Sequence, residues 1–83
     1  MSNERAQLRA EIAIANRKIA EKNLLAEQYA MELREMLAPS IMDYYAELPM
    51  LSFGTTFDQL KIIWREMGDL KKQVAKMETA LNG

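Results

Sequence analysis

The feature that most constrains this chain is an unbroken series of apolar residues in its second half. They alternate spacings of three and four residues, with mostly polar or charged residues between them: Leu60, Ile63, Met67, Leu70, Val74, Met77 and Leu81. This is the a/d pattern of a heptad repeat, which forms one narrow apolar stripe along an α-helix and needs a second helix to cover it. The sequence therefore predicts a long helix over residues 56–81 that packs against another helix.

A second long helix is predicted over residues 4–38. This segment contains neither Pro nor Gly and is rich in residues of high helix propensity, and Pro39 limits its extent. Its main apolar stripe also follows a heptad: Leu8, Ile12, Ala15, Ile19, Ala26, Tyr29, Leu33 and Met36. Lys22 interrupts this stripe in the middle. Further apolar residues lie off the stripe, which indicates that this helix contacts two neighbours: Ile14, Leu24, Leu25, Met31 and Leu37.

An apolar connector, residues 39–57, lies between the two heptad patterns and reads PSIMDYYAELPMLSFGTTF. Part of it has apolar residues at i, i+3, i+4 and i+7: Ile41, Tyr44, Tyr45 and Leu48. This spacing predicts a short amphipathic helix over residues 40–48, which must bury its apolar face against the hairpin itself or against another protein.

The end of the connector predicts a tight return of the chain. Pro49 ends the short helix, and Gly54 favours a turn over residues 49–55 because glycine accepts unusual backbone angles. Either Thr55 or Thr56 then supplies a capping box that starts the last helix. Trp64 flanks the stripe of that helix, where it is expected to pack at the rim or against another subunit.

The size of the chain favours self-association. A single domain of 83 residues has a marginal hydrophobic core, and the absence of cysteine removes disulfides as a source of stability. We therefore predict an all-α fold for residues 1–83, a helical hairpin with a long helix, a short connector helix and a long helix. Two copies are expected to form a homodimer, as a four-helix bundle or a coiled coil.

The composition argues against an enzyme or a metal site. The chain has no Cys and no His, and thus lacks the commonest nucleophile–base pairs and the commonest metal ligand. Asp43 and Glu47 are better explained as a solvated helix face than as a catalytic pair. Glu32 and Glu35 lack the histidines of the usual helical-bundle metal motif. No catalytic residue, cofactor or metal is therefore expected.

The charge pattern gives little support for nucleic acid or membrane as a partner. The net charge is -1, and the basic residues of each long helix are interleaved with acids. These basic residues are Arg5, Arg9, Arg17, Lys18, Lys22, Lys71, Lys72 and Lys76. No apolar run approaches the roughly 20 residues that span a bilayer, and the segment MSNERAQLRAE has no secretory-signal pattern. The expected location is the cytoplasm.

Protein–protein interaction remains as the predicted function, in a small adaptor, regulator or inhibitor such as a bacterial or phage accessory factor. Seven methionines suit an adaptable surface, and aromatic residues and Met are enriched in interfaces. The candidate partner-binding residues are Tyr44, Tyr45, Met50, Leu51 and Phe53. Alternatively, the apolar residues of the connector only plug the open end of the hairpin: Tyr44, Tyr45, Leu48, Leu51, Phe53 and Phe57. A nucleic-acid-binding regulator and a purely structural oligomer are the other functional hypotheses.

Overall fold

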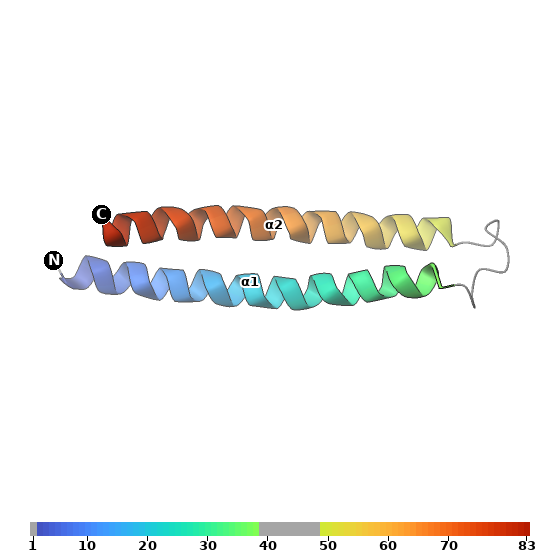
Figure 1. The fold of residues 1–83 in the computed structure, drawn as a ribbon, viewed down its shortest axis with the longest axis horizontal. Coiled ribbons are helices and arrows are strands. Elements are labelled where there is room, and N and C mark those ends of the chain that lie inside the picture. The colour runs from blue at the N-terminus through green and yellow to red at the C-terminus, as the bar shows by residue number, and fades with distance from the viewer. Residues whose placement is uncertain (1, 39–48) are drawn as a thin grey trace.

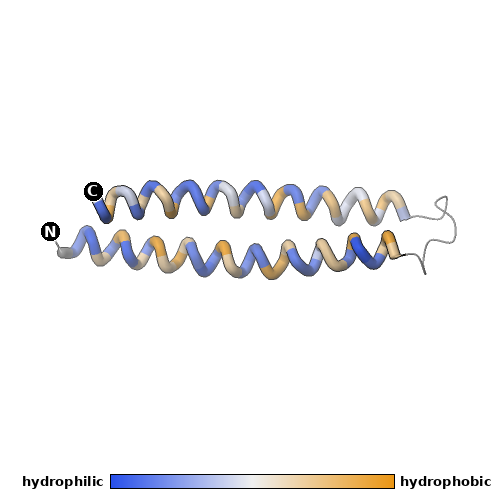
Figure 2. Tube along the Cα trace, in the orientation of Figure 1, coloured by the Kyte–Doolittle hydropathy of each residue, from blue (hydrophilic) through white to orange (hydrophobic). Residues whose placement is uncertain are grey.

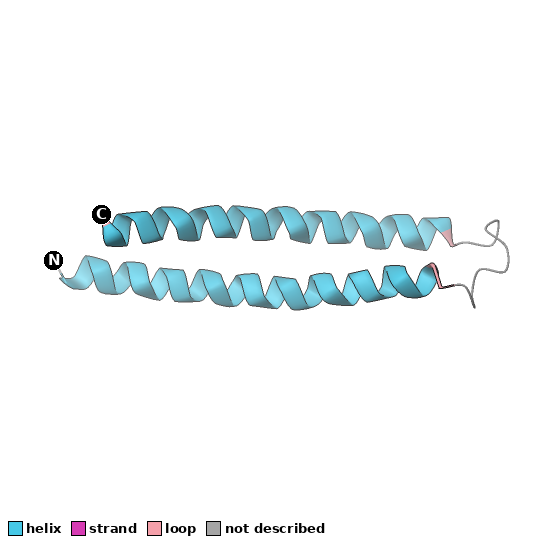
Figure 3. Ribbon diagram, viewed as in Figure 1, coloured by secondary structure: helices cyan, strands magenta, loops and turns pink. Residues whose placement is uncertain are grey.

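The computed structural model describes residues 2–38 and 49–83, and within them the chain forms two long helices side by side (Figure 1). Helix α1 spans Ser2–Met36 and helix α2 spans Met50–Asn82. The helices are antiparallel, so both chain ends lie at the same end of the rod. The predicted all-α hairpin is confirmed, whereas the predicted short helix over 40–48 lies outside the described residues. Within the described ranges, the only non-helical residues flank the two helices (Figure 3).

Helix α1 agrees with its prediction to within two residues at each end. Glu4 lies in the first turn, where a carboxylate interacts favourably with the helix dipole. At the other end the Leu37 N–H donates to the carbonyls of both Leu33 and Arg34, at 3.1 Å each. This shared bond tightens the last turn just before Pro39, which cannot continue the helix.

Helix α2 begins six residues earlier than predicted, and the predicted turn over 49–55 is wrong. The Phe53 N–H donates to the Pro49 carbonyl at 2.8 Å, which closes the first helical turn, and Gly54 does not have a positive φ. The predicted capping boxes at Thr55 and Thr56 are wrong for the same reason, because both threonines lie inside the helix. Pro49 occupies the N-cap position without a side-chain hydrogen bond.

The heptad pattern explains why the helix extends through this segment. Phe53 and Thr56 continue the alternating spacing upstream of Leu60, and both are at least half-buried against α1. One glycine in a helix costs about 1 kcal/mol relative to alanine, which the added packing of one and a half turns can offset. At the opposite end Gly83 caps α2, with its N–H donating to the Thr79 carbonyl at 2.8 Å.

The core is a single seam between the two helices. Every residue of both predicted stripes is buried or half-buried, and the apolar residues recur along each helix between polar ones (Figure 2). The most buried apolar side chains come from the middle of the seam: Ala15, Ile63, Met67 and Val74. Thr56 is also buried. The radius of gyration is 18.7 Å, whereas a compact domain of this length has about 12 Å.

Lys22 is a charged residue within this seam. It occupies the position that interrupts the apolar stripe of α1, and its side chain is 29% exposed. Its ammonium group forms an ion pair with the Glu66 carboxylate of α2, which is 46% exposed. The pair thus satisfies a cation that would otherwise lie unpartnered beside apolar neighbours.

Replacement of Lys22 by leucine is expected to stabilise the hairpin. An ion pair this exposed contributes less than about 1 kcal/mol, while burial of a leucine contributes about 1.5–3 kcal/mol. We therefore expect Lys22→Leu to raise the free energy of unfolding by about 1–2 kcal/mol in urea titrations at fixed protein concentration. The matched control is Lys18→Leu, at an exposed position one turn away, which should change little. A destabilised Lys22→Leu variant would show that the ion pair is a net stabiliser.

Candidate functional site

Large apolar side chains are more often exposed than buried in the described residues. Ten of them are at least 40% exposed: Ile14, Leu24, Leu25, Met31, Leu37, Met50, Leu51, Phe57, Ile62 and Trp64. This follows from the architecture, because each helix of a pair covers only one stripe of the other. Exposed apolar side chains bear on function where they gather on one part of the surface, and two parts of the hairpin show this.

The first cluster of exposed apolar side chains lies where α1 ends and α2 begins. We call it the hairpin tip and define it by Leu37, Met50 and Leu51, which are 47%, 67% and 89% exposed. Leu37 directly follows the last residue of α1, and the other two form the first turn of α2. The tip therefore projects apolar groups from the ends of two packed helices.

The second cluster of exposed apolar side chains runs along α2, next to the seam. We call it the α2 ridge and define it by Met50, Phe57 and Trp64, which are seven residues apart and so share one edge of the helix. Trp64 is 71% exposed and Phe57 is 45% exposed. The Lys61 ammonium lies 5.3 Å from the centroid of the Phe57 ring, within the range of a cation–π contact.

Phe53 connects the seam to the ridge. Its ring stacks on Phe57 with the centroids 6.4 Å apart and the planes at 7°, and Phe53 itself is half-buried. Phe57 remains 45% exposed despite this contact. Phe53 therefore packs against the Phe57 ring from the side of the seam and is not itself a fully exposed binding group.

The predicted partner-binding residues have different surroundings in the structure. Met50 and Leu51 are exposed at the tip, Phe53 is partly in the seam, and Tyr44 and Tyr45 lie outside the described residues. The sequence prediction places neither Phe57 nor Trp64 among the partner-binding residues, although it expects Trp64 to pack at the rim of the stripe or against another subunit. The turn predicted over residues 49–55 separates Met50 from the helix, so the spacing of seven that defines the ridge is absent from that prediction.

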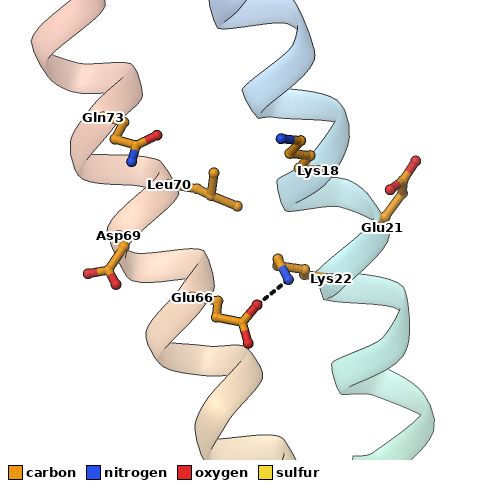
Figure 4. Close-up of a pocket in the computed structure, with 7 residues that line it drawn as sticks. All are labelled: Lys18, Glu21, Lys22, Glu66, Asp69, Leu70 and Gln73. Carbon is orange, nitrogen blue, oxygen red and sulfur yellow. Dashed lines mark hydrogen bonds and ion pairs between the residues drawn. The ribbon is translucent and has the colours of Figure 1, made fainter.

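A charged groove lies between the helices near their middle (Figure 4). Its volume is about 520 Å³, and it is lined by Lys18, Glu21, Lys22, Glu66, Asp69, Leu70 and Gln73. Figure 4 shows Leu70 directed toward α1, while Glu21 and Asp69 turn away from the space between the helices. Lys22 is already paired with Glu66.

This groove has few of the properties of a reactive site. Glu21 and Asp69 are exposed, and water solvates both charged groups. Acid–base catalysis needs a pocket that encloses the reacting groups, whereas this groove is open to solvent. Within residues 2–38 and 49–83, no group of three or more acidic residues is arranged to hold a metal ion.

Comparison with protein-family models, with curated proteins and with solved structures finds no match for this chain. Neither α1 nor α2 combines the length and the apolar character needed to cross a bilayer. The tip and the ridge are therefore the features from which a function can be inferred.

The different burial of the two stacked rings leads to a stability prediction. Phe53→Ala removes a ring from the seam and is expected to lower the free energy of unfolding by about 2–3 kcal/mol. Phe57→Ala removes a half-exposed ring and is expected to cost about 1 kcal/mol or less. Urea unfolding followed by circular dichroism measures both values. Equal losses for the two variants would contradict the assignment of Phe53 to the seam and Phe57 to the surface.

Proposed function

We propose that this chain is a non-enzymatic protein–protein interaction module, a small oligomeric hairpin that acts as an adaptor, regulator or inhibitor of a larger protein. The observation that carries the proposal is the exposure of Leu51, at 89%, beside Met50 and Leu37 at the hairpin tip. An isolated exposed leucine needs no explanation, but three exposed apolar residues at the same end of a rod favour a docking role.

The chemistry of the tip favours a protein as the partner. Met50 and Leu51 offer flexible apolar contact surface, which suits a groove or a helix face of another protein. The tip residues carry no charge, whereas binding to nucleic acid depends on cations that neutralise phosphates. The basic residues of α2 lie further along the rod and alternate with Asp58, Glu66 and Asp69.

The long seam supplies the rigidity that such a module needs. Helices of 35 and 33 residues pack against each other along their length, so the tip is attached to a rod and not to an isolated loop. A rigid support lowers the entropy lost on binding because fewer groups must be ordered in the complex.

Affinity capture from the native host, followed by reconstitution from purified components, tests this function. We expect one stoichiometric protein partner, and we expect Leu51→Asp to weaken its binding at least tenfold while helicity is unchanged. The matched control is Leu24→Asp, because Leu24 is 61% exposed in the middle of α1, far from the tip. Equal losses for the two variants would show that the tip is not the docking site.

Binding to immobilised RNA and DNA at low salt separates this proposal from the nucleic-acid hypothesis. We expect no retention, since basic and acidic side chains are mixed along both helices. Retention that falls steeply with added salt would contradict the proposal and favour a nucleic-acid-binding regulator.

A further inference from the structure

A single hairpin leaves an unusually large surface in contact with water. Its accessible surface is 6657 Å², whereas a folded monomer of this mass is expected to expose about 5,100 Å². The surplus of about 1,600 Å² per chain is twice the roughly 800 Å² that each partner buries in a stable interface of standard size. The hairpin therefore has enough uncovered surface to form such an interface without unfolding.

The α2 ridge is the part of this surface best suited to the centre of an interface. Trp64 is 71% exposed, and tryptophan is the residue type most enriched among those that dominate binding energy. Met50 and Phe57 extend the same apolar edge along α2. An interface centred here leaves the seam intact, because the ridge lies beside the a/d stripe and not within it.

A groove lies directly beside Trp64, which forms part of its lining. Its volume is about 510 Å³, and it is lined by Trp64, Arg65, Met67, Gly68, Asp69, Lys71 and Lys72. A Cβ atom added to Gly68 would meet no other atom within 4 Å, so the space over this glycine is open. Arg65, Lys71 and Lys72 supply cations around this space, and cations favour contact with the face of an indole ring.

We propose that a second copy of this chain covers the α2 ridge, with the Trp64 ring of each copy inserted over Gly68 of the other. A twofold axis makes this possible, because in an isologous interface the same ridge meets the same groove twice. This inference deepens the oligomeric part of the proposed function and rests on it, while the side chain of Leu51 remains free for another protein.

The fluorescence of Trp64 tests this interface directly because it is the only tryptophan in the chain. In the dimer the indole leaves water, so its emission is expected at shorter wavelength at high protein concentration. Dilution through the micromolar range should return the emission to that of an exposed indole, in parallel with dissociation. Emission of an exposed indole at every concentration, from a chain that stays helical, would overturn the proposal.

Two substitutions test whether the α2 ridge forms the dimer interface. Trp64→Glu should raise the dissociation constant of the dimer about thirtyfold or more, with helicity unchanged. The matched control is Ile14→Glu, because Ile14 is 54% exposed on α1 and should leave the dissociation constant unchanged. Sedimentation velocity measures both constants without relying on the tryptophan. Dissociation caused by the control and not by Trp64→Glu would overturn the assignment.

The substitution Gly68→Ala distinguishes a dimer interface at this face of α2 from a face that stays exposed to solvent. On a free face alanine should only stabilise the helix, since it has the higher helix propensity. In the proposed dimer the new methyl group occupies the space for the indole ring, so the dissociation constant should rise at least severalfold although the helix is favoured. An unchanged or lower dissociation constant would contradict the insertion of Trp64 over Gly68.

The two proposals can fail separately. Loss of partner capture in Leu51→Asp together with a monomeric wild-type chain would leave the proposed docking function intact and remove only the ridge interface. A dimer disrupted by Trp64→Glu, with no partner captured at the tip, would leave the ridge interface intact and favour a purely structural oligomer.

Discussion

The structure depends on one geometric constraint, which is that two helices in contact bury only one stripe of each. The heptads of α1 and α2 supply these stripes, and the seam is complete from the first turns of one helix to the last turns of the other. Many of the other apolar residues in the described ranges are exposed, among them Trp64 and Leu51. The same packing that makes the hairpin regular thus leaves it with apolar surface that another protein chain can cover.

The seam also contains a charged position that bears on its alignment. A polar residue at a seam position specifies the register of paired helices at a cost in stability. Lys22 occupies such a position, and its ion pair with Glu66 forms only when these two residues lie opposite each other. A shift of one helix by a heptad would place Lys22 against a different part of α2 and leave its charge without this partner.

Much of this architecture is predictable from the sequence because the dominant interaction is periodic. The stripes of both helices and the end of α1 before Pro39 follow from local rules, and the structure agrees with them. The start of α2 is not predictable from the same rules, because Pro49 and Gly54 individually favour a turn. Packing of Phe53 and Thr56 against α1 overrides that preference, which is a tertiary effect. The ridge was missed for this reason, since Met50 joins Phe57 and Trp64 on one edge only if the helix already includes it.

We propose that the hairpin is half of a larger helical assembly held together outside its own seam. Sedimentation equilibrium of the purified chain across the micromolar range measures the mass of this assembly. We expect twice the mass of a single chain, decreasing toward the mass of one chain on dilution. A mass of one chain at every concentration, with full helicity, would contradict it.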